Sequence, residues 1–142
     1  MRLFLDANVL FSAARNPEGR AAALLAFAER GVCDLVTSPH AIEEARRNLD
    51  VKRPDLTAHW ARLLRKVRIL SESRPEGIAW AEAQGLPPKD APILAAAAEA
   101  QADLLVTGDR AHFGALYGRK MRGVEIVTPA VALGRLLGLL LW

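Results

Sequence analysis

A chain of 142 residues that is 51% hydrophobic and 25% charged has the composition of a globular domain, which excludes a mainly disordered chain and a small disulfide-stabilised fold. Lysine and arginine outnumber aspartate and glutamate by 19 to 16, so the formal net charge is only +3. Cys33 is the only cysteine, which excludes an intrachain disulfide and a cysteine-based metal site and fits the reducing cytoplasm where we expect this protein to act.

Short β-like runs alternate with longer helical stretches along the chain. In order, the pattern predicts a strand at 2–5, a helix at 18–29, a strand at 34–37, helices at 39–49 and 56–66, a strand at 67–70, helices at 77–83 and 91–100, strands at 104–107 and 124–127, and a helix at 129–141. This alternation is typical of βαβ units with a parallel sheet and helices on both faces. No apolar stretch approaches the roughly 18 residues of a membrane span, and we expect one domain over residues 1–142.

Several boundaries of these elements have local signals. Ser38-Pro39 and Thr128-Pro129 each place an N-cap residue and a first-turn proline directly after a predicted strand. Gly31 can end the helix before it, and Pro87-Pro88 predicts an extended break before residue 91. These signals support the predicted order of elements.

The predicted elements sort the aspartates by sheet edge. Asp34 and Asp103 lie at the starts of their strands, whereas Asp6 and Asp109 follow the carboxyl ends of theirs. Asp90 opens the helix that leads back to the strand at 104–107, so it falls on the same edge as Asp6 and Asp109. Ligands of open α/β sheets bind at the carboxyl edge of the strands. We therefore expect three aspartates at a functional edge.

Glu43 and Glu44, near the start of the helix at 39–49, lie at the same edge, and one of them could point inward. Each acid also has an ordinary explanation, because Asp6, Asp90 and Asp109 could be helix N-caps and the glutamates could be solvated. Those explanations do not account for the convergence, since carboxylates gathered at one edge repel one another. Oxygen ligands without cysteine favour Mg²⁺ or Mn²⁺, which would activate water and stabilise charge on a phosphoryl group.

Four motifs carry a family resemblance: LDANVL at 5–10, EARRNL at 44–49, KDAPIL at 89–94 and VTGD at 106–109. In this order and over nearly the whole chain, they resemble the PIN-domain family of metal-dependent ribonucleases. The resemblance implies a three-layer α/β/α sandwich with a central, mostly parallel five-stranded sheet of order 3-2-1-4-5. It also implies that the acidic cluster binds Mg²⁺ or Mn²⁺. The implied reaction is hydrolysis of RNA phosphodiester bonds that leaves a 5′-phosphate and a 3′-hydroxyl. Endonucleolytic cleavage is expected.

The resemblance also implies roles for individual residues. The catalytic and metal-binding acids would be Asp6, Glu44, Asp90 and Asp109, with Asn8 and Thr107 in support. Glu44 is preferred to Glu43 because the family places its acid five residues before a leucine, here Leu49.

One position departs from the family pattern. Many members carry a further acid two or three residues after the last aspartate, where this chain has Ala111, His112 and Phe113. The number of metal ions is therefore left open, and His112 has two interpretations: it faces the substrate, or it is a surface histidine on a short helix.

Basic residues gather in two segments. Residues 46–68 hold eight basic and two acidic residues, and residues 110–122 hold four basic residues and no acid. A positive rim around a carboxylate site suits a polyanion, and Arg46, Arg47, Arg110 and His112 are the predicted RNA-binding residues. Solvation of helix faces explains such charges equally well. Tyr117 and Trp60 could stack on bases, although packing in a core or interface is the simpler reading.

The last segment, residues 131–142, has leucines at helical spacing, and Leu139 and Trp142 widen the apolar stripe. Such a helix is buried in its own chain or shared with a second copy, and PIN domains often pair. Many small PIN domains are toxins of toxin–antitoxin pairs, so an antitoxin partner is expected beside the RNA substrate. Two alternatives stay open: a catalytically silent domain that binds RNA or protein, and a phosphatase with Asp6 as nucleophile, for which Asn8 is a poor acid.

Overall fold

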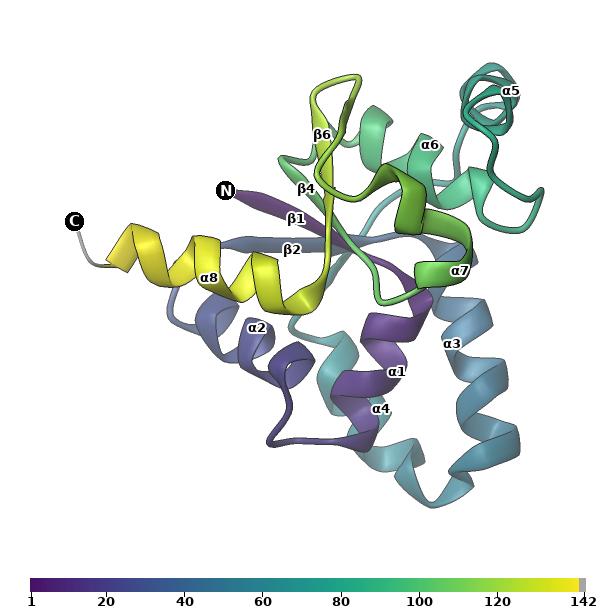
Figure 1. Ribbon diagram of the computed structural model, residues 1–142. Coiled ribbons are helices and arrows are strands. Elements are labelled where there is room, and N and C mark those ends of the chain that lie inside the picture. Colours follow the sequence, from purple (N-terminus) through teal and green to yellow (C-terminus); the bar gives the residue numbers. More distant parts are fainter. Residues whose placement is uncertain (141–142) are drawn as a thin grey trace.

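The computed structural model describes residues 1–140 (Figure 1), and within them one sheet contains six strands in the order β3-β2-β1-β4-β6-β5. The strands are β1 (Arg2–Leu5), β2 (Asp34–Thr37), β3 (Arg68–Ile69), β4 (Leu104–Val106), β5 (Lys120–Met121) and β6 (Val124–Val127). All neighbours pair in parallel except β5 and β6, which are antiparallel. The predicted α/β class and five-strand order are confirmed, with β6 as the predicted fifth strand. The predicted strand count is corrected by β5, a short antiparallel edge strand.

Eight α-helices surround the sheet in the part of the chain that is described. They are α1 (Ala7–Arg15), α2 (Arg20–Glu29), α3 (Pro39–Lys52), α4 (Thr57–Leu64), α5 (Pro75–Ala83), α6 (Ala91–Glu99), α7 (Arg110–Phe113) and α8 (Pro129–Leu140), with short 3₁₀ turns at Pro54–Leu56 and Gly114–Leu116. All six predicted helices are present with ends shifted by a few residues. The prediction for residue 141, and that for Trp142, lie outside the described residues. The helices α1 and α7 are additional.

The helices form two layers. Figure 1 shows α1, α2, α4 and α8 below the sheet and α5 and α6 above it. The alanine-rich helix α6 packs against α5 and β4, and Ala91, Ala95 and Ala97 on it are fully buried. Their small side chains allow a close approach of the helix to its neighbours. Among residues 1–140, no helix has the length and apolar character needed to cross a membrane.

The helix α1 follows β1 after a single residue, so it continues the apolar run of the strand. Its buried residues include Val9, Leu10, Ala13 and Ala14, whose spacing is that of one helix face. The Asp6 backbone is extended, and its carboxylate accepts a hydrogen bond from the Ala7 amide. This tight junction positions the Asp6 carboxylate at the carboxyl edge of the sheet.

Two further junctions bring helices to the same edge. The Ser38 hydroxyl accepts a hydrogen bond from the Ala41 amide at the start of α3, and the Thr128 hydroxyl accepts one from the Val131 amide at the start of α8. Both N-cap predictions are confirmed. Gly31, which follows the C-cap residue Arg30 of α2, has a φ of 76°, a left-handed conformation that glycine adopts at low cost.

Candidate functional site

Four carboxylates line one cavity of about 410 Å³ at the carboxyl edge of the sheet. We call it the acidic cavity, and its acids are Asp6, Glu44, Asp90 and Asp109. They come from four different segments: the end of β1, the helix α3, the start of α6 and the loop after β4. The polar side chains of Asn8, Ser12, Asn48 and Lys89 complete its polar lining. The fold therefore brings together the four acids that the sequence assigns to the site.

The Asp6 carboxylate is buried and held by three hydrogen bonds. It accepts from the Ala7 amide at 2.7 Å, from the Thr107 hydroxyl at 2.8 Å and from the Asn8 side-chain amide at 3.1 Å. The residue is only 3% exposed. Burial raises the pKa of Asp6 from 3.8 to about 6, and the nearby charges of Glu44 and Asp90 add to that rise. A nearby cation would counter both effects.

Thr107 connects the neighbouring segments of the site. Its hydroxyl is fully buried and, besides donating to Asp6, accepts hydrogen bonds from the Asp109 amide at 3.1 Å and from the Asn8 side chain at 3.3 Å. The side-chain oxygen of Asn8, Oδ1, in turn accepts a hydrogen bond from the Gly108 amide at 2.7 Å. Asn8 and Thr107 thus fix the relative positions of Asp6 and Asp109, the supporting role that the sequence suggests for them.

Asp90 occupies the N-cap position of α6 without making a side-chain capping bond. Its residue is 3% exposed, and its Oδ2 atom is buried without a hydrogen-bond partner among the described residues. This oxygen lies 2.9 Å from His112 Nδ1, a nitrogen whose hydrogen bond is with Asp109 Oδ2. Burial raises the pKa of Asp90. Capping of α6 therefore does not explain why the Asp90 carboxylate is buried at this position.

Asp109 and His112 meet at the start of α7. The Asp109 carboxylate accepts a hydrogen bond from the His112 amide at 3.2 Å and contacts His112 Nδ1 at 2.8 Å. Asp90, Asp109 and His112 each offer one ligand atom, and these three atoms lie within 4.8 Å of one another. His112, interpreted from the sequence as facing the substrate, thus lies against two of the site's carboxylates. It stands near the place of the acid that the family pattern would supply.

The three arginines predicted to bind RNA do not line the acidic cavity. Arg46 pairs with Glu43 and, at 2.9 Å, with Asp50, while Arg47 lies 4.0 Å from Glu43. These exposed side chains occupy the outer face of α3, whereas Glu44 faces the acidic cavity. Arg110 lines a neighbouring cavity instead.

Ser12 and Asn48, two residues not predicted from the sequence, also line the acidic cavity. Each follows an assigned residue by four positions on the same helix, Asn8 on α1 and Glu44 on α3. Residues with this spacing share a helix face. That periodicity is the signal by which the sequence could have revealed them.

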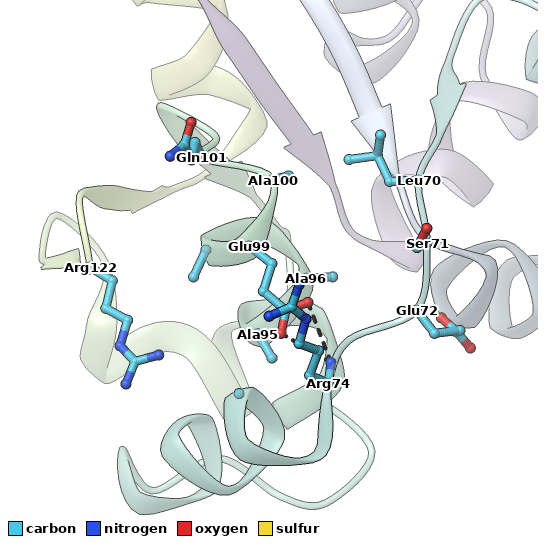
Figure 2. A pocket seen from close by; sticks show the side chains of 12 residues that line it. Leu70, Ser71, Glu72, Arg74, Ala95, Ala96, Glu99, Ala100, Gln101 and Arg122 are labelled. Atoms are coloured by element: carbon cyan, nitrogen blue, oxygen red, sulfur yellow. Dashed lines mark hydrogen bonds between the residues drawn. The ribbon is translucent and has the colours of Figure 1, made fainter.

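A larger cavity, of about 610 Å³, lies between α5 and the C-terminal half of α6. Figure 2 shows Arg74 and Glu99 meeting on its floor, where the Arg74 amide donates to the Glu99 carboxylate at 3.0 Å. Arg122 lies at the side of this cavity. Its guanidinium carbon stacks over the Trp80 ring, 4.0 Å from the ring centroid. The four acids assigned to the site line the smaller, acidic cavity instead. The volume of a cavity alone therefore does not identify the candidate active site.

Comparison with known proteins identifies the family. A family model described as a PIN domain matches residues 2–111. The chain belongs to the PIN-domain family. No curated protein matches this PIN domain significantly.

Solved structures share its fold at low sequence identity. PAE2754 from Pyrobaculum aerophilum is 20% identical with a TM-score of 0.67, and the match covers 97% of this chain and 99% of that chain. VapBC2 from Rickettsia felis, bound to a DNA fragment from its promoter, is 17% identical with a TM-score of 0.66, covering 90% and 98%. FitAcB from Neisseria gonorrhoeae is 22% identical with a TM-score of 0.60, covering 90% and 98%. The PIN fold therefore extends over nearly the whole chain.

Proposed function

We propose that this PIN domain is a Mg²⁺- or Mn²⁺-dependent endoribonuclease that hydrolyses RNA phosphodiester bonds at the acidic cavity. The observation that carries the proposal is the convergence of Asp6, Glu44, Asp90 and Asp109 on one cavity, two of them almost fully buried. Four carboxylates share this cavity with Lys89 and lie beside His112, so protons or a cation are needed to offset the remaining negative charge. Family membership makes a divalent cation in a nuclease site the favoured choice.

The residues present fit such a cation. Asp90 Oδ2 is a buried acceptor with no hydrogen-bond partner in residues 1–140, and one oxygen of Asp109 and one nitrogen of His112 lie close to it. Carboxylate oxygens are preferred by Mg²⁺, and Mn²⁺ accepts both carboxylates and imidazole. We assign metal binding to Asp6, Asp90 and Asp109, with Glu44 completing the acidic set.

A bound divalent cation would lower the pKa of an attacking water and stabilise the charge that builds on the scissile phosphate. The chain's own residues supply the positioning. Thr107 and Asn8 hold the Asp6 carboxylate through hydrogen bonds of 2.8 and 3.1 Å, and this rigidity favours a single geometry at the reacting phosphate. Lys89, which also lines the cavity, can contact a phosphate oxygen.

The test is cleavage of a labelled single-stranded RNA with Mn²⁺ or Mg²⁺ by the Asp6→Asn variant. We expect cleavage by the parent protein, its loss in EDTA, its return on adding metal, and no cleavage by the variant. Asp103→Asn is the matched control, because Asp103 is an exposed aspartate at the opposite edge of the sheet. Undiminished activity of Asp6→Asn would overturn the site. RNA binding in EDTA with no cleavage under any metal would favour the silent binding domain.

We further propose that the protein is the toxin of a toxin–antitoxin pair and forms a homodimer. Membership of the PIN family supports the first proposal, since many small members are such toxins. Exposed leucines on α8 support the second, because Leu137, Leu139 and Leu140 are 47–53% exposed. Growth arrest on expression of the parent protein, and its loss in Asp6→Asn, test the toxin role. Growth unaffected by the parent protein would contradict it.

A further inference from the structure

A second cavity, of about 470 Å³, adjoins the acidic cavity. We call it the arginine cavity after Arg20 and Arg110, which line it together with Asn16, Tyr117 and Thr128 among others. We propose that it is a nucleotide subsite that binds the backbone phosphate and base of single-stranded RNA next to the scissile bond. This inference rests on the proposed function, which places the scissile phosphate in the acidic cavity.

The two cavities form one groove. Ser12, Gly108 and Pro129 line both of them, so a strand that leaves the acidic cavity past these residues enters the arginine cavity. The three shared residues, a glycine, a serine and a proline, have small side chains. A volume of a few hundred Å³ matches a small-molecule site and is sufficient for one nucleotide.

The charge of the lining inverts along this groove. The acidic cavity has four carboxylates and one lysine, whereas the residues that line the arginine cavity include two arginines and no acid. A nucleic acid strand carries a phosphate at every nucleotide, and each phosphate outside a cation site gains from a basic partner. The inversion therefore matches a strand whose scissile phosphate lies among the acids and whose next phosphate lies between the arginines.

Both arginines are available to a ligand. Arg20 and Arg110 are exposed, and neither forms a salt bridge with another described residue, whereas Arg46, Arg53 and Arg135 are all paired. A guanidinium group without a carboxylate partner can bind a phosphate through two parallel hydrogen bonds. Arg20 begins α2 and Arg110 begins α7, so two separate elements place their charges at one cavity.

Tyr117 supplies an aromatic ring to the same cavity. Its hydroxyl donates a 2.8 Å hydrogen bond to the Thr107 carbonyl oxygen, which ties the half-buried ring to the backbone that forms the acidic site. A ring held in this way offers a stacking surface for a base, a contact that tolerates any base identity. The cavity thus combines the two features of single-stranded nucleic acid sites, basic side chains for the backbone and an aromatic ring for a base.

The test measures binding of a fluorescent single-stranded RNA of mixed sequence to the full chain in EDTA, so that cleavage does not interfere. We expect Arg20→Ala and Arg110→Ala each to weaken binding about 3- to 10-fold and to reduce the slope of log K against log salt by about 1. Arg65→Ala is the matched control, because Arg65 is an exposed arginine that lines a different cavity beside Cys33 and Asp34. It should leave both quantities unchanged.

A second pair of variants tests the ring. Tyr117→Leu should weaken binding of RNA about tenfold, while binding of an abasic oligonucleotide of equal length should change little. Tyr117→Phe keeps the ring and should retain most of the affinity. A matched single-stranded DNA that binds with the same dependence on Arg20 and Arg110 also supports the subsite, since phosphates and bases are common to both.

Equal losses in Arg20→Ala, Arg110→Ala and Arg65→Ala would overturn the subsite, because they would indicate unspecific attraction to positive charge. Unchanged binding in the first two variants would also overturn it. These outcomes are separate from failure of the nuclease proposal, which would appear as absent metal-dependent cleavage in the parent protein while its RNA binding still depends on the two arginines.

Discussion

The Thr107 hydroxyl donates a 2.8 Å hydrogen bond to Asp6 Oδ2 and so joins the ends of two neighbouring parallel strands. Leu5 of β1 pairs with Val106 of β4, which places the next residue of each strand side by side at the carboxyl edge. The same hydroxyl accepts the Asp109 amide proton at 3.1 Å. One buried oxygen thus couples the positions of two acids that are far apart in the sequence.

Replacing Thr107 by valine should therefore destabilise the fold and loosen the site. The valine has nearly the same shape, but it leaves the Asp109 amide without its acceptor and Asp6 without one donor. Loss of these bonds at a buried position costs about 1–3 kcal/mol of unfolding free energy. Thr107→Ser keeps the hydroxyl and is the control. Urea unfolding in EDTA measures both variants, and a loss in Thr107→Ser as large as that in Thr107→Val would mean that packing of the methyl group matters as much as the hydroxyl.

The metal-free protein should lose stability as the pH rises from about 4 to about 6. Burial raises the pKa of Asp6 from 3.8 to about 6, so the folded chain binds more protons than the unfolded chain within that window. The unfolding free energy therefore falls with rising pH, by roughly 3 kcal/mol for a shift of about two units. The raised pKa of Asp90, also caused by burial, acts in the same direction.

Asp6→Asn isolates this contribution because it removes the charge and keeps the size. In EDTA at pH 7.5 the variant should have a higher melting temperature than the parent protein, and the difference should disappear near pH 4. Asp103→Asn at the opposite edge leaves Asp6 in place, so this variant should keep the parent protein's fall in stability between about pH 4 and about pH 6. A variant less stable than the parent at pH 7.5 would show that the hydrogen bonds of Asp6 outweigh the cost of its charge.

Much of this architecture could be predicted from the sequence, because the elements that were predicted correctly have signals in their own few residues. The Ser38-Pro39 junction has its own N-cap signal, and Asp6 is assigned to its edge by the direction of a single strand. The short strand β5 was missed because two residues give no periodicity, and α1 because Asp6 alone separates it from β1 and no loop marks its start. The approach of His112 to Asp90 depends on how α7 packs beside α6, which no local pattern encodes.

The exposed leucines of α8 predict self-association. Leu137 and Leu140 are about half exposed while Leu136, on the same helix, is fully buried, so one face of α8 packs inside the chain and another faces solvent. Leu137→Glu combined with Leu140→Glu should convert a dimer into a monomer in light-scattering measurements, because charges at an apolar contact are costly to bury. Arg135→Glu is not a suitable control, because it breaks a salt bridge with Glu125. Val51→Glu changes an apolar residue on α3 that is 82% exposed and should leave the mass unchanged.

The position of His112 predicts a preference for Mn²⁺ over Mg²⁺. Its Nδ1 lies 2.9 Å from Asp90 Oδ2 and 2.8 Å from Asp109 Oδ2, so a cation held by these oxygens would meet a nitrogen ligand as well. Imidazole suits transition metals, whereas Mg²⁺ favours oxygen alone. Metal titrations that follow the melting temperature, and the free Mn²⁺ signal in electron paramagnetic resonance, measure affinity without any assay of cleavage.

His112→Asp supplies the acid that many family members carry near this position and separates the two explanations of the histidine. If His112 binds metal, the variant should narrow the ratio of Mn²⁺ to Mg²⁺ affinity by about tenfold, and His112→Ala should weaken Mn²⁺ binding by a factor of about 10 to 100. His59→Asp is the control, because His59 lies on α4 in a different cavity. An unchanged ratio in His112→Asp would contradict metal binding by His112 and would leave the two interpretations from the sequence, a contact with the substrate and a surface histidine.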